Sequence, residues 1–202
     1  MLLALIGLNV LVSLAAFRAL GAGRGAGFLF VPWQVARGRN LRGMLLAHFA
    51  HSGVPHLLFN MLALVSFGES VLSALGAAKF LLLYVISGLG SDLVVFALHR
   101  NDATYRCLGA SGSVFGIVMA AVVLDPATSI SFVFVPVPIP GPLFMLGYAL
   151  IAVVLILRGH RGGVSHEGHL GGAIVGLLLT GALAPRGLRP LLQWFAEWAR
   201  PG

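Results

Sequence analysis

Residues 109–116 read GASGSVFG, and this stretch opens an apolar segment that runs from Ser111 to Leu124. The small residues around Ser111 place a hydroxyl group at the start of a predicted helix and leave little bulk beside it. About 14 residues at about 1.5 Å each reach about 21 Å, which is short of the roughly 30 Å hydrocarbon core of a bilayer. We therefore expect Ser111 to lie below the membrane surface, in a cavity that admits water.

The composition is that of an integral membrane protein. Of the 202 residues, 58% are hydrophobic and 9% are charged, and the mean hydropathy is +0.97. The net charge of +7 favours contact with anionic lipids, because no basic patch interleaved with aromatic residues indicates binding to nucleic acid. The single cysteine, Cys107, excludes an intrachain disulfide.

Hydropathy predicts six spans, all helical because an open sheet cannot satisfy its backbone in lipid. The predicted spans are Met1–Leu20, His56–Leu75, Phe80–His99, Ser111–Leu124, Pro142–Leu157 and His169–Ala184. The long first loop, about residues 21–50, is predicted to lie at the membrane interface. Four prolines exclude a regular helix in residues 131–142. We expect an all-α, polytopic six-helix bundle over residues 1–184 and an amphipathic tail, residues 185–202, on the membrane surface.

Polar side chains are costly inside a membrane, so those within the spans are functional candidates. His56 and Asn60 lie one turn apart at the start of the second span. Ser111 opens the fourth span and His169 opens the sixth. Helices that alternate in direction begin on the same side at every second span, so these residues are expected at one level. A further set of residues is expected to let the helices pack closely around these polar groups: Gly109, Gly112, Phe115, Gly116, Gly172 and Gly176.

These residue types suggest nucleophilic catalysis. A serine hydroxyl is a weak nucleophile unless a base takes its proton, and histidine is the usual base. Ser111 and His169 are therefore predicted to form a catalytic Ser-His dyad, with Phe115 holding the imidazole by stacking. His56, Asn60 and the backbone N–H of Ser111 are predicted to bind the oxyanion.

A zinc site is the alternative that the string HEGH, residues 166–169, suggests. Its two histidines are at i and i+3, whereas a zinc-binding helix presents them at i and i+4. No metal is therefore expected. Glu167 within this string is predicted to be solvated.

Four strings resemble the rhomboid intramembrane serine proteases in their order and spacing. They are HSGVPHLLFNMLAL (51–64), ALGAAKFLLLYVISGLG (74–90), GASGSVFG (109–116) and HLGGAIVG (169–176). The resemblance implies that Ser111 is the nucleophile and His169 its base. It also implies that His56 and Asn60 contribute to the oxyanion site.

The resemblance further implies the partners and the location of the protein. The expected substrates are transmembrane segments of other membrane proteins, cleaved without a metal or other cofactor. Membrane lipids are the other expected partner, and no binding to nucleic acid is expected. By similarity to six-span bacterial members, the site is expected to open to the extracytoplasmic side of an inner membrane. The distribution of the basic residues favours the opposite orientation, because basic loops tend to lie on the cytoplasmic side. The alternative is a catalytically silent rhomboid-like binding or chaperone protein.

Overall fold

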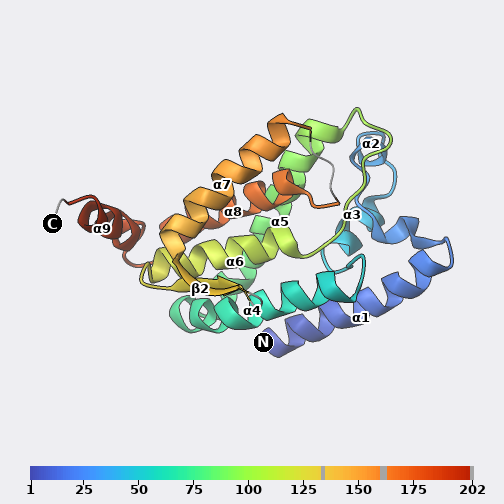
Figure 1. The fold of residues 1–202 in the computed structure, drawn as a ribbon. Coiled ribbons are helices and arrows are strands. Elements are labelled where there is room, and N and C mark those ends of the chain that lie inside the picture. The colour runs from blue at the N-terminus through green and yellow to red at the C-terminus, as the bar shows by residue number, and fades with distance from the viewer. Residues whose placement is uncertain (133–134, 160–162, 201–202) are drawn as a thin grey trace.

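A computed structural model of the chain describes residues 1–132, 135–159 and 163–200, and these ranges are mostly helical (Figure 1). The elements in chain order are α1 (Leu2–Gly21), the 3₁₀ helix η1 (Gly25–Phe28), α2 (Pro32–Val35), α3 (Leu41–Ala47), α4 (Val54–Leu75), α5 (Ala77–His99), α6 (Ser111–Leu124), β1 (Ser129–Phe132), β2 (Val135–Pro140), α7 (Gly141–Leu157), α8 (His166–Leu183) and α9 (Arg189–Trp198).

Each of the six predicted spans is a helix, which confirms the fold class of a helical membrane bundle. Among the described helices, α1, α4 and α5 are long and apolar enough to cross a membrane, and α6 and α7 are apolar but shorter. Large aliphatic side chains such as Leu3, Leu93 and Leu150 stay exposed on the outer faces. A surface of this kind suits lipid as its solvent.

Helix α8 begins at His166, three residues before the predicted start at His169. The reason is a cap, because the Ser165 hydroxyl accepts a hydrogen bond from the Gly168 N–H at 3.3 Å. His169 therefore lies one turn inside the helix, and its own N–H donates to the Ser165 carbonyl. Helix α6 begins at Ser111, as the sequence predicts.

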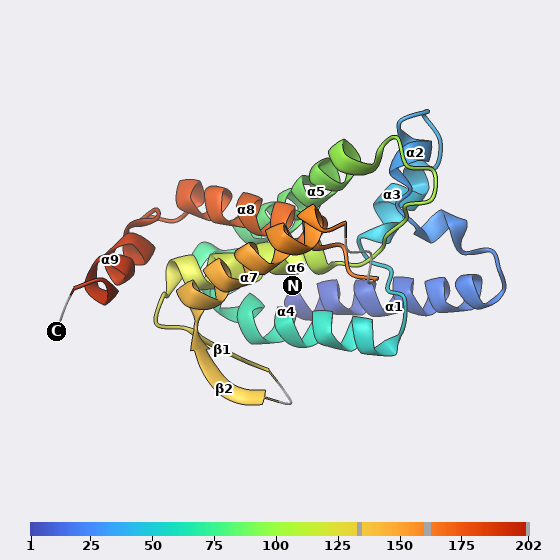
Figure 2. The ribbon, with the colours of Figure 1, turned by 45° about the horizontal axis from the view of Figure 1, so that its top comes forward.

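Helix α6 forms the centre of the bundle, with α4, α5 and α8 packed around it (Figure 2). Ten of its 14 residues are buried. A helix that is apolar on every side has no face suited to water and is enclosed by other helices. The serine at its start is half-buried, where the enclosed part of the helix begins.

Helices α6 and α8 meet backbone to backbone at two glycine pairs. A Cβ atom at Gly172 would collide with the backbone of Gly112, and one at Gly176 would lie 2.5–2.9 Å from the backbone of Gly116. Only a hydrogen fits at these positions unless the helices separate. We call these four residues the glycine seam; it holds the start of α8 against the start of α6.

The first loop is folded and supports the segment that leads into α6. Phe30 and Cys107 exchange two backbone hydrogen bonds, at 2.8 and 3.0 Å. The N–H of Gly109 donates to the carbonyl of Ala47 at the end of α3, at 2.9 Å. The backbone just before Ser111 is thus hydrogen-bonded to the first loop at two points, Phe30 and Ala47.

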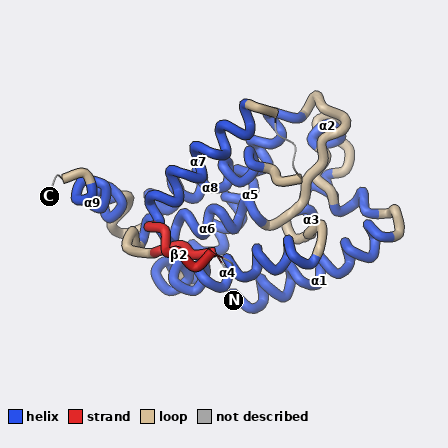
Figure 3. Tube along the Cα trace, in the orientation of Figure 1, coloured by secondary structure: helices blue, strands red, loops and turns tan. Residues whose placement is uncertain are grey.

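Within the proline-rich stretch, Val135–Pro140 form a strand and not a helix, as predicted, and α7 begins directly after it at Gly141. The strands themselves are not predicted by the sequence analysis (Figure 3). Strands β1 and β2 pair antiparallel, with Ser129 opposite Pro140 and Ile130 opposite Ile139. Prolines recur at every second residue of β2, so the missing N–H groups all face one edge of the strand. The other edge keeps its donors and can pair with β1.

The tail forms the helix α9, which packs against α6. Leu191 is buried in this contact, whereas Leu192 and Trp198 are exposed. The rings of Trp194 and Trp198 stack at 6.2 Å. The helix therefore has one apolar side against the bundle and further apolar groups that remain uncovered.

The substitution Gly172→Ala is expected to lower the melting temperature of the protein in detergent. Its methyl group would force α6 and α8 apart, and overpacking of this kind costs about 1–3 kcal/mol. Thermal unfolding followed by circular dichroism measures the effect. Gly147→Ala on α7 is the control, because a Cβ atom there meets nothing within 4 Å. Equal melting temperatures for the two variants would contradict the role of the glycine seam.

Candidate active site

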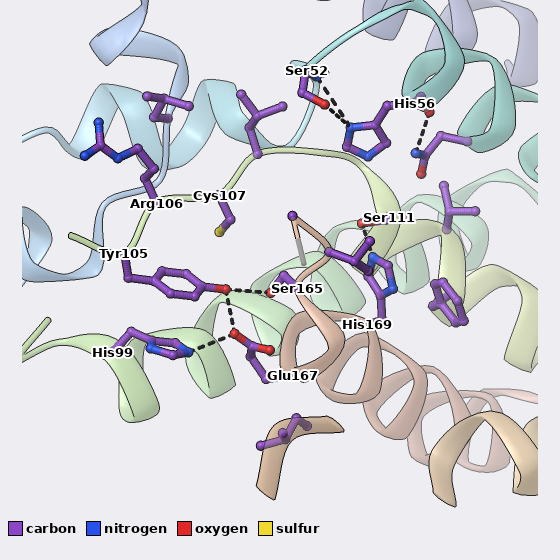
Figure 4. A pocket seen from close by; sticks show the side chains of 18 of the residues that line it. Ser52, His56, His99, Tyr105, Arg106, Cys107, Ser111, Ser165, Glu167 and His169 are labelled. Atoms are coloured by element: carbon purple, nitrogen blue, oxygen red, sulfur yellow. Dashed lines mark hydrogen bonds and ion pairs between the residues drawn. The ribbon is translucent and has the colours of Figure 1, made fainter. Parts of the chain in front are cut away.

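A cavity of about 940 Å³ lies between the first turns of α4, α6 and α8 and the segment that joins α5 to α6 (Figure 4). The predicted site residues gather at one end of it. The other end is also polar and contains groups that the sequence analysis did not assign to the site. The residues at the first end are His56, Asn60, Ser111, Phe115 and His169, and those at the second end are His99, Tyr105, Arg106, Ser165 and Glu167.

Ser111 and His169 are in direct contact, with 2.7 Å between Ser111 Oγ and His169 Nε2. Ser111 is the first residue of α6, so the N–H groups of the first turn have no carbonyl partner within the helix. The preceding Gly109 has φ +137°, a conformation that L side chains rarely adopt. The turn at Gly109 and the glycine seam together bring the hydroxyl to the imidazole.

Aromatic rings surround the His169 imidazole. Phe115 stacks on it, with ring centroids 4.6 Å apart and an interplanar angle of 19°. The hydroxyl of Tyr148 on α7 lies 2.8 Å from His169 Nδ1. The sequence analysis missed Tyr148, although a tyrosine in an otherwise apolar span was the signal that could have found it.

His56 is oriented by Ser52. The backbone N–H of Ser52 donates to His56 Nδ1 at 3.4 Å, and the Ser52 hydroxyl lies 3.1 Å from the same atom. Because Nδ1 accepts, the neutral ring carries its proton on Nε2. A Cβ atom at Gly109 would lie 2.9 Å from His56 Nε2 and 3.5 Å from Ser111 Oγ, so this N–H faces the neighbourhood of the serine.

Asn60 lines the same end of the cavity, but its amide is partly occupied. Its Nδ2 donates to the carbonyl of His56, one turn earlier on α4, at 2.9 Å. An amide nitrogen has two hydrogens, so one remains for another acceptor.

His51 is fully buried behind His56, with the two rings edge to face at 4.9 Å. Ser13 on α1 donates to the carbonyl of Phe49 at 3.0 Å, so its oxygen accepts from His51 Nδ1 at 2.8 Å. Burial, followed by the neighbouring His56, lowers the pKa of His51 from 6.5 to about 4. His51 is therefore neutral. It connects α1 to His56, because it bonds to Ser13 on α1 and its ring packs against the His56 ring.

Glu167 is buried and hydrogen-bonded, so the prediction that it is solvated was wrong. Its Oε1 lies 2.8 Å from His99 Nε2 and accepts from the Tyr105 hydroxyl at 2.6 Å (Figure 4). Burial raises the pKa of Tyr105, so its hydroxyl keeps the proton it donates. These bonds fasten the start of α8 to the end of α5 and direct the carboxylate away from His169.

Asp92 within α5 is also paired, at 2.8 Å from His48 Nε2. In the part of the chain that the structure describes, no group of three or more histidine, cysteine or acidic side chains is arranged to hold a metal ion. Both ring nitrogens of His169 already have partners in Ser111 and Tyr148. His169 therefore contacts a hydroxyl group through each of its ring nitrogens.

The chain is similar in sequence to known proteins over most of its length. A family profile described as the Rhomboid domain matches residues 37–186. The chain is 34% identical to the mitochondrial presenilin-associated rhomboid-like protein A of Danio rerio, over 76% of this chain and 41% of that protein. It is 33% identical to the rhomboid protease AarA of Providencia stuartii, over 69% of this chain and 55% of that protein.

A third relative is the rhomboid protease GluP of Bacillus subtilis, 32% identical over 66% of this chain and 24% of that protein. The chain thus spans about half or less of the length of these relatives. The profile covers the two helices that carry the serine and the histidine, and it also covers α4 and the part of the first loop that includes α3. By this match, the chain belongs to the rhomboid family.

Proposed function

We propose that the protein is an intramembrane serine endopeptidase. The observation that supports this most directly is the 2.7 Å contact between Ser111 Oγ and His169 Nε2 at the end of a cavity of about 940 Å³. A hydroxyl bonded to a base beside a space for substrate is the arrangement that acyl transfer needs. The proposed unit is the six-helix bundle of residues 1–184, with residues 185–202 lying on the membrane surface.

In the first half of the proposed reaction, Ser111 Oγ attacks the carbonyl carbon of the scissile bond and its proton passes to His169 Nε2. The carbonyl oxygen becomes an oxyanion. The Nε2–H of His56 and the N–H of Ser111 stabilise it, and the free hydrogen of the Asn60 amide adds a weaker contribution. His169 then donates its proton to the amide nitrogen, the C–N bond breaks, and the amine leaves.

In the second half, water attacks the acyl-enzyme as His169 removes one of its protons. The C–O bond to Ser111 breaks and the serine oxygen regains a proton from His169. The polar groups at both ends of the cavity can bind the water that this step consumes, although the surrounding helices are apolar. Substrates are membrane-anchored proteins whose helix can unwind, because Ser111 can attack only an extended peptide bond.

Ser111→Ala and His169→Ala are each expected to abolish cleavage of a membrane-anchored substrate and to leave the melting temperature close to that of the wild type. The first removes the nucleophile and the second removes its base. Cleavage in reconstituted vesicles measures the activity. A fluorophosphonate, which reacts with activated serines, should give an adduct on Ser111 that mass spectrometry locates.

Ser113→Ala is the matched control, because Ser113 lies on the same helix but is buried away from the cavity lining. It should keep both cleavage and labelling. Full activity in Ser111→Ala or in His169→Ala would rule out the dyad. An unreactive Ser111 in the wild type, with a reagent shown to label an active serine protease of the membrane, would favour the catalytically silent binding protein.

The oxyanion assignment predicts unequal effects at two neighbouring positions. His56→Ala is expected to lower kcat about 100-fold, within the range for loss of one oxyanion donor. Asn60→Ala should lower it about tenfold or less, because its amide already donates to the His56 carbonyl. Steady-state kinetics in detergent measures both. A larger loss in Asn60→Ala than in His56→Ala would reverse the assignment.

We also propose that the N-terminus faces the cytoplasm and that the cavity opens to the other side of the membrane. Helices α2 and α9 lie at opposite ends of the bundle (Figure 1), so exposed alanines there report the two sides. In a Cys107→Ala background, Ala36→Cys should react with a membrane-impermeant maleimide on intact cells. Ala196→Cys should react only after permeabilisation, and the reverse pattern would invert the topology.

A further inference from the structure

His169 has a hydrogen-bonding partner on each ring nitrogen. Ser111 Oγ lies 2.7 Å from Nε2, and the Tyr148 hydroxyl lies 2.8 Å from Nδ1. The two partners come from different helices, α6 and α7. The imidazole is therefore held between a serine on one side and a phenol on the other.

The role of the phenol follows from the tautomer that a base requires. To accept the serine proton, Nε2 must present its lone pair, so the neutral ring must carry its hydrogen on Nδ1. That N–H points at the Tyr148 oxygen, which accepts it. When His169 becomes an imidazolium, the same bond becomes charge-assisted and therefore stronger.

Ring stacking alone does not provide this orientation. Phe115 packs against the face of the imidazole at 4.6 Å and fixes the plane of the ring. A half-turn about the Cβ–Cγ bond preserves that plane, but it exchanges Nε2 with Cε1 and places a carbon against Ser111. A hydroxyl that bonds to Nδ1 adds to the Ser111 contact in selecting the productive orientation, because it distinguishes Nδ1 from Cδ2, and the Tyr148 hydroxyl is such a partner.

No carboxylate takes this position among the contacts described for His169. Glu167, the nearest acidic residue along the chain, is bound by His99 and Tyr105 at the other end of the cavity. Phe115 also packs against the Tyr148 ring, at 4.6 Å, so the phenol itself is held in place. A neutral hydroxyl in this setting orients the base without placing a second charge in the apolar bundle.

We propose that Tyr148 is a positioning residue for His169: its hydroxyl accepts the Nδ1 hydrogen, which fixes the tautomer and the rotamer in which Nε2 faces Ser111. The inference rests on the proposed function of the Ser111–His169 pair. It extends that pair with a third group, drawn from α7.

The test is Tyr148→Phe, which removes the hydroxyl and keeps the ring. We expect kcat for a membrane-anchored substrate to fall about tenfold, as for loss of one hydrogen bond to a charged group. The rate of labelling of Ser111 by a fluorophosphonate should fall by a similar factor. KM should not change, because the hydroxyl bonds to the base and not to the substrate.

Tyr84→Phe is the matched control. Tyr84 is buried and its hydroxyl lies 3.3 Å from Asn9 Nδ2, but it is not among the residues that line the cavity. This variant should lower the melting temperature and leave kcat and the labelling rate unchanged. Tyr148→Phe should show the opposite pattern, which separates positioning of the base from a loss of stability.

Wild-type rates in Tyr148→Phe would overturn the inference, and so would a rise in KM with kcat unchanged. Tyr148→Gln adds a second check, because a side-chain carbonyl can accept the Nδ1 hydrogen. Partial recovery of the labelling rate relative to Tyr148→Phe would support the inference. A wild-type protein whose Ser111 does not react would instead overturn the proposed function on which this inference depends.

Discussion

The backbones of α6 and α8 touch at the glycine seam, and this contact sets the position of every group around the cavity that these two helices carry. Where Gly112 and Gly116 face Gly172 and Gly176, the two helix axes come closer than side chains would allow. The seam begins with Gly112, directly after Ser111, and with Gly172, three residues after His169. The hydroxyl and the imidazole can therefore meet, although 58 positions separate them along the chain.

A second constraint is the cost of polar groups inside an apolar bundle. The chain meets it by pairing them across elements. Ser13 bonds to His51, His48 to Asp92, and His99 to Glu167. The first pair joins α1 to the segment before α4, the second joins the first loop to α5, and the third joins α5 to α8. The hydrogen bonds that support the cavity therefore also connect the elements around it. The same logic applies to Tyr148, whose hydroxyl has its partner in His169.

Hydropathy predicted the helices of the six spans well, because lipid leaves few choices for a backbone. The start of α6 at Ser111 and the ends of α4, α5 and α7 agree with the sequence analysis. The hairpin β1–β2 was not predicted, because alternating prolines exclude a helix without indicating a partner strand. The start of α8 was misplaced by one turn, because the capping role of Ser165 was not considered.

Hydropathy and helix direction are local properties that add along the chain. The amino-acid sequence alone therefore indicates a helical membrane protein with a serine, two histidines and an asparagine at the starts of alternate spans. Which atoms meet depends on the tertiary structure. Glu167 turns to His99 and Tyr105, Ser52 sets the tautomer of His56, and Tyr148 reaches His169 from a helix that sequence spacing does not link to it. These contacts depend on how helices pack and rotate against one another, which is a property of the assembled bundle and not of any one segment.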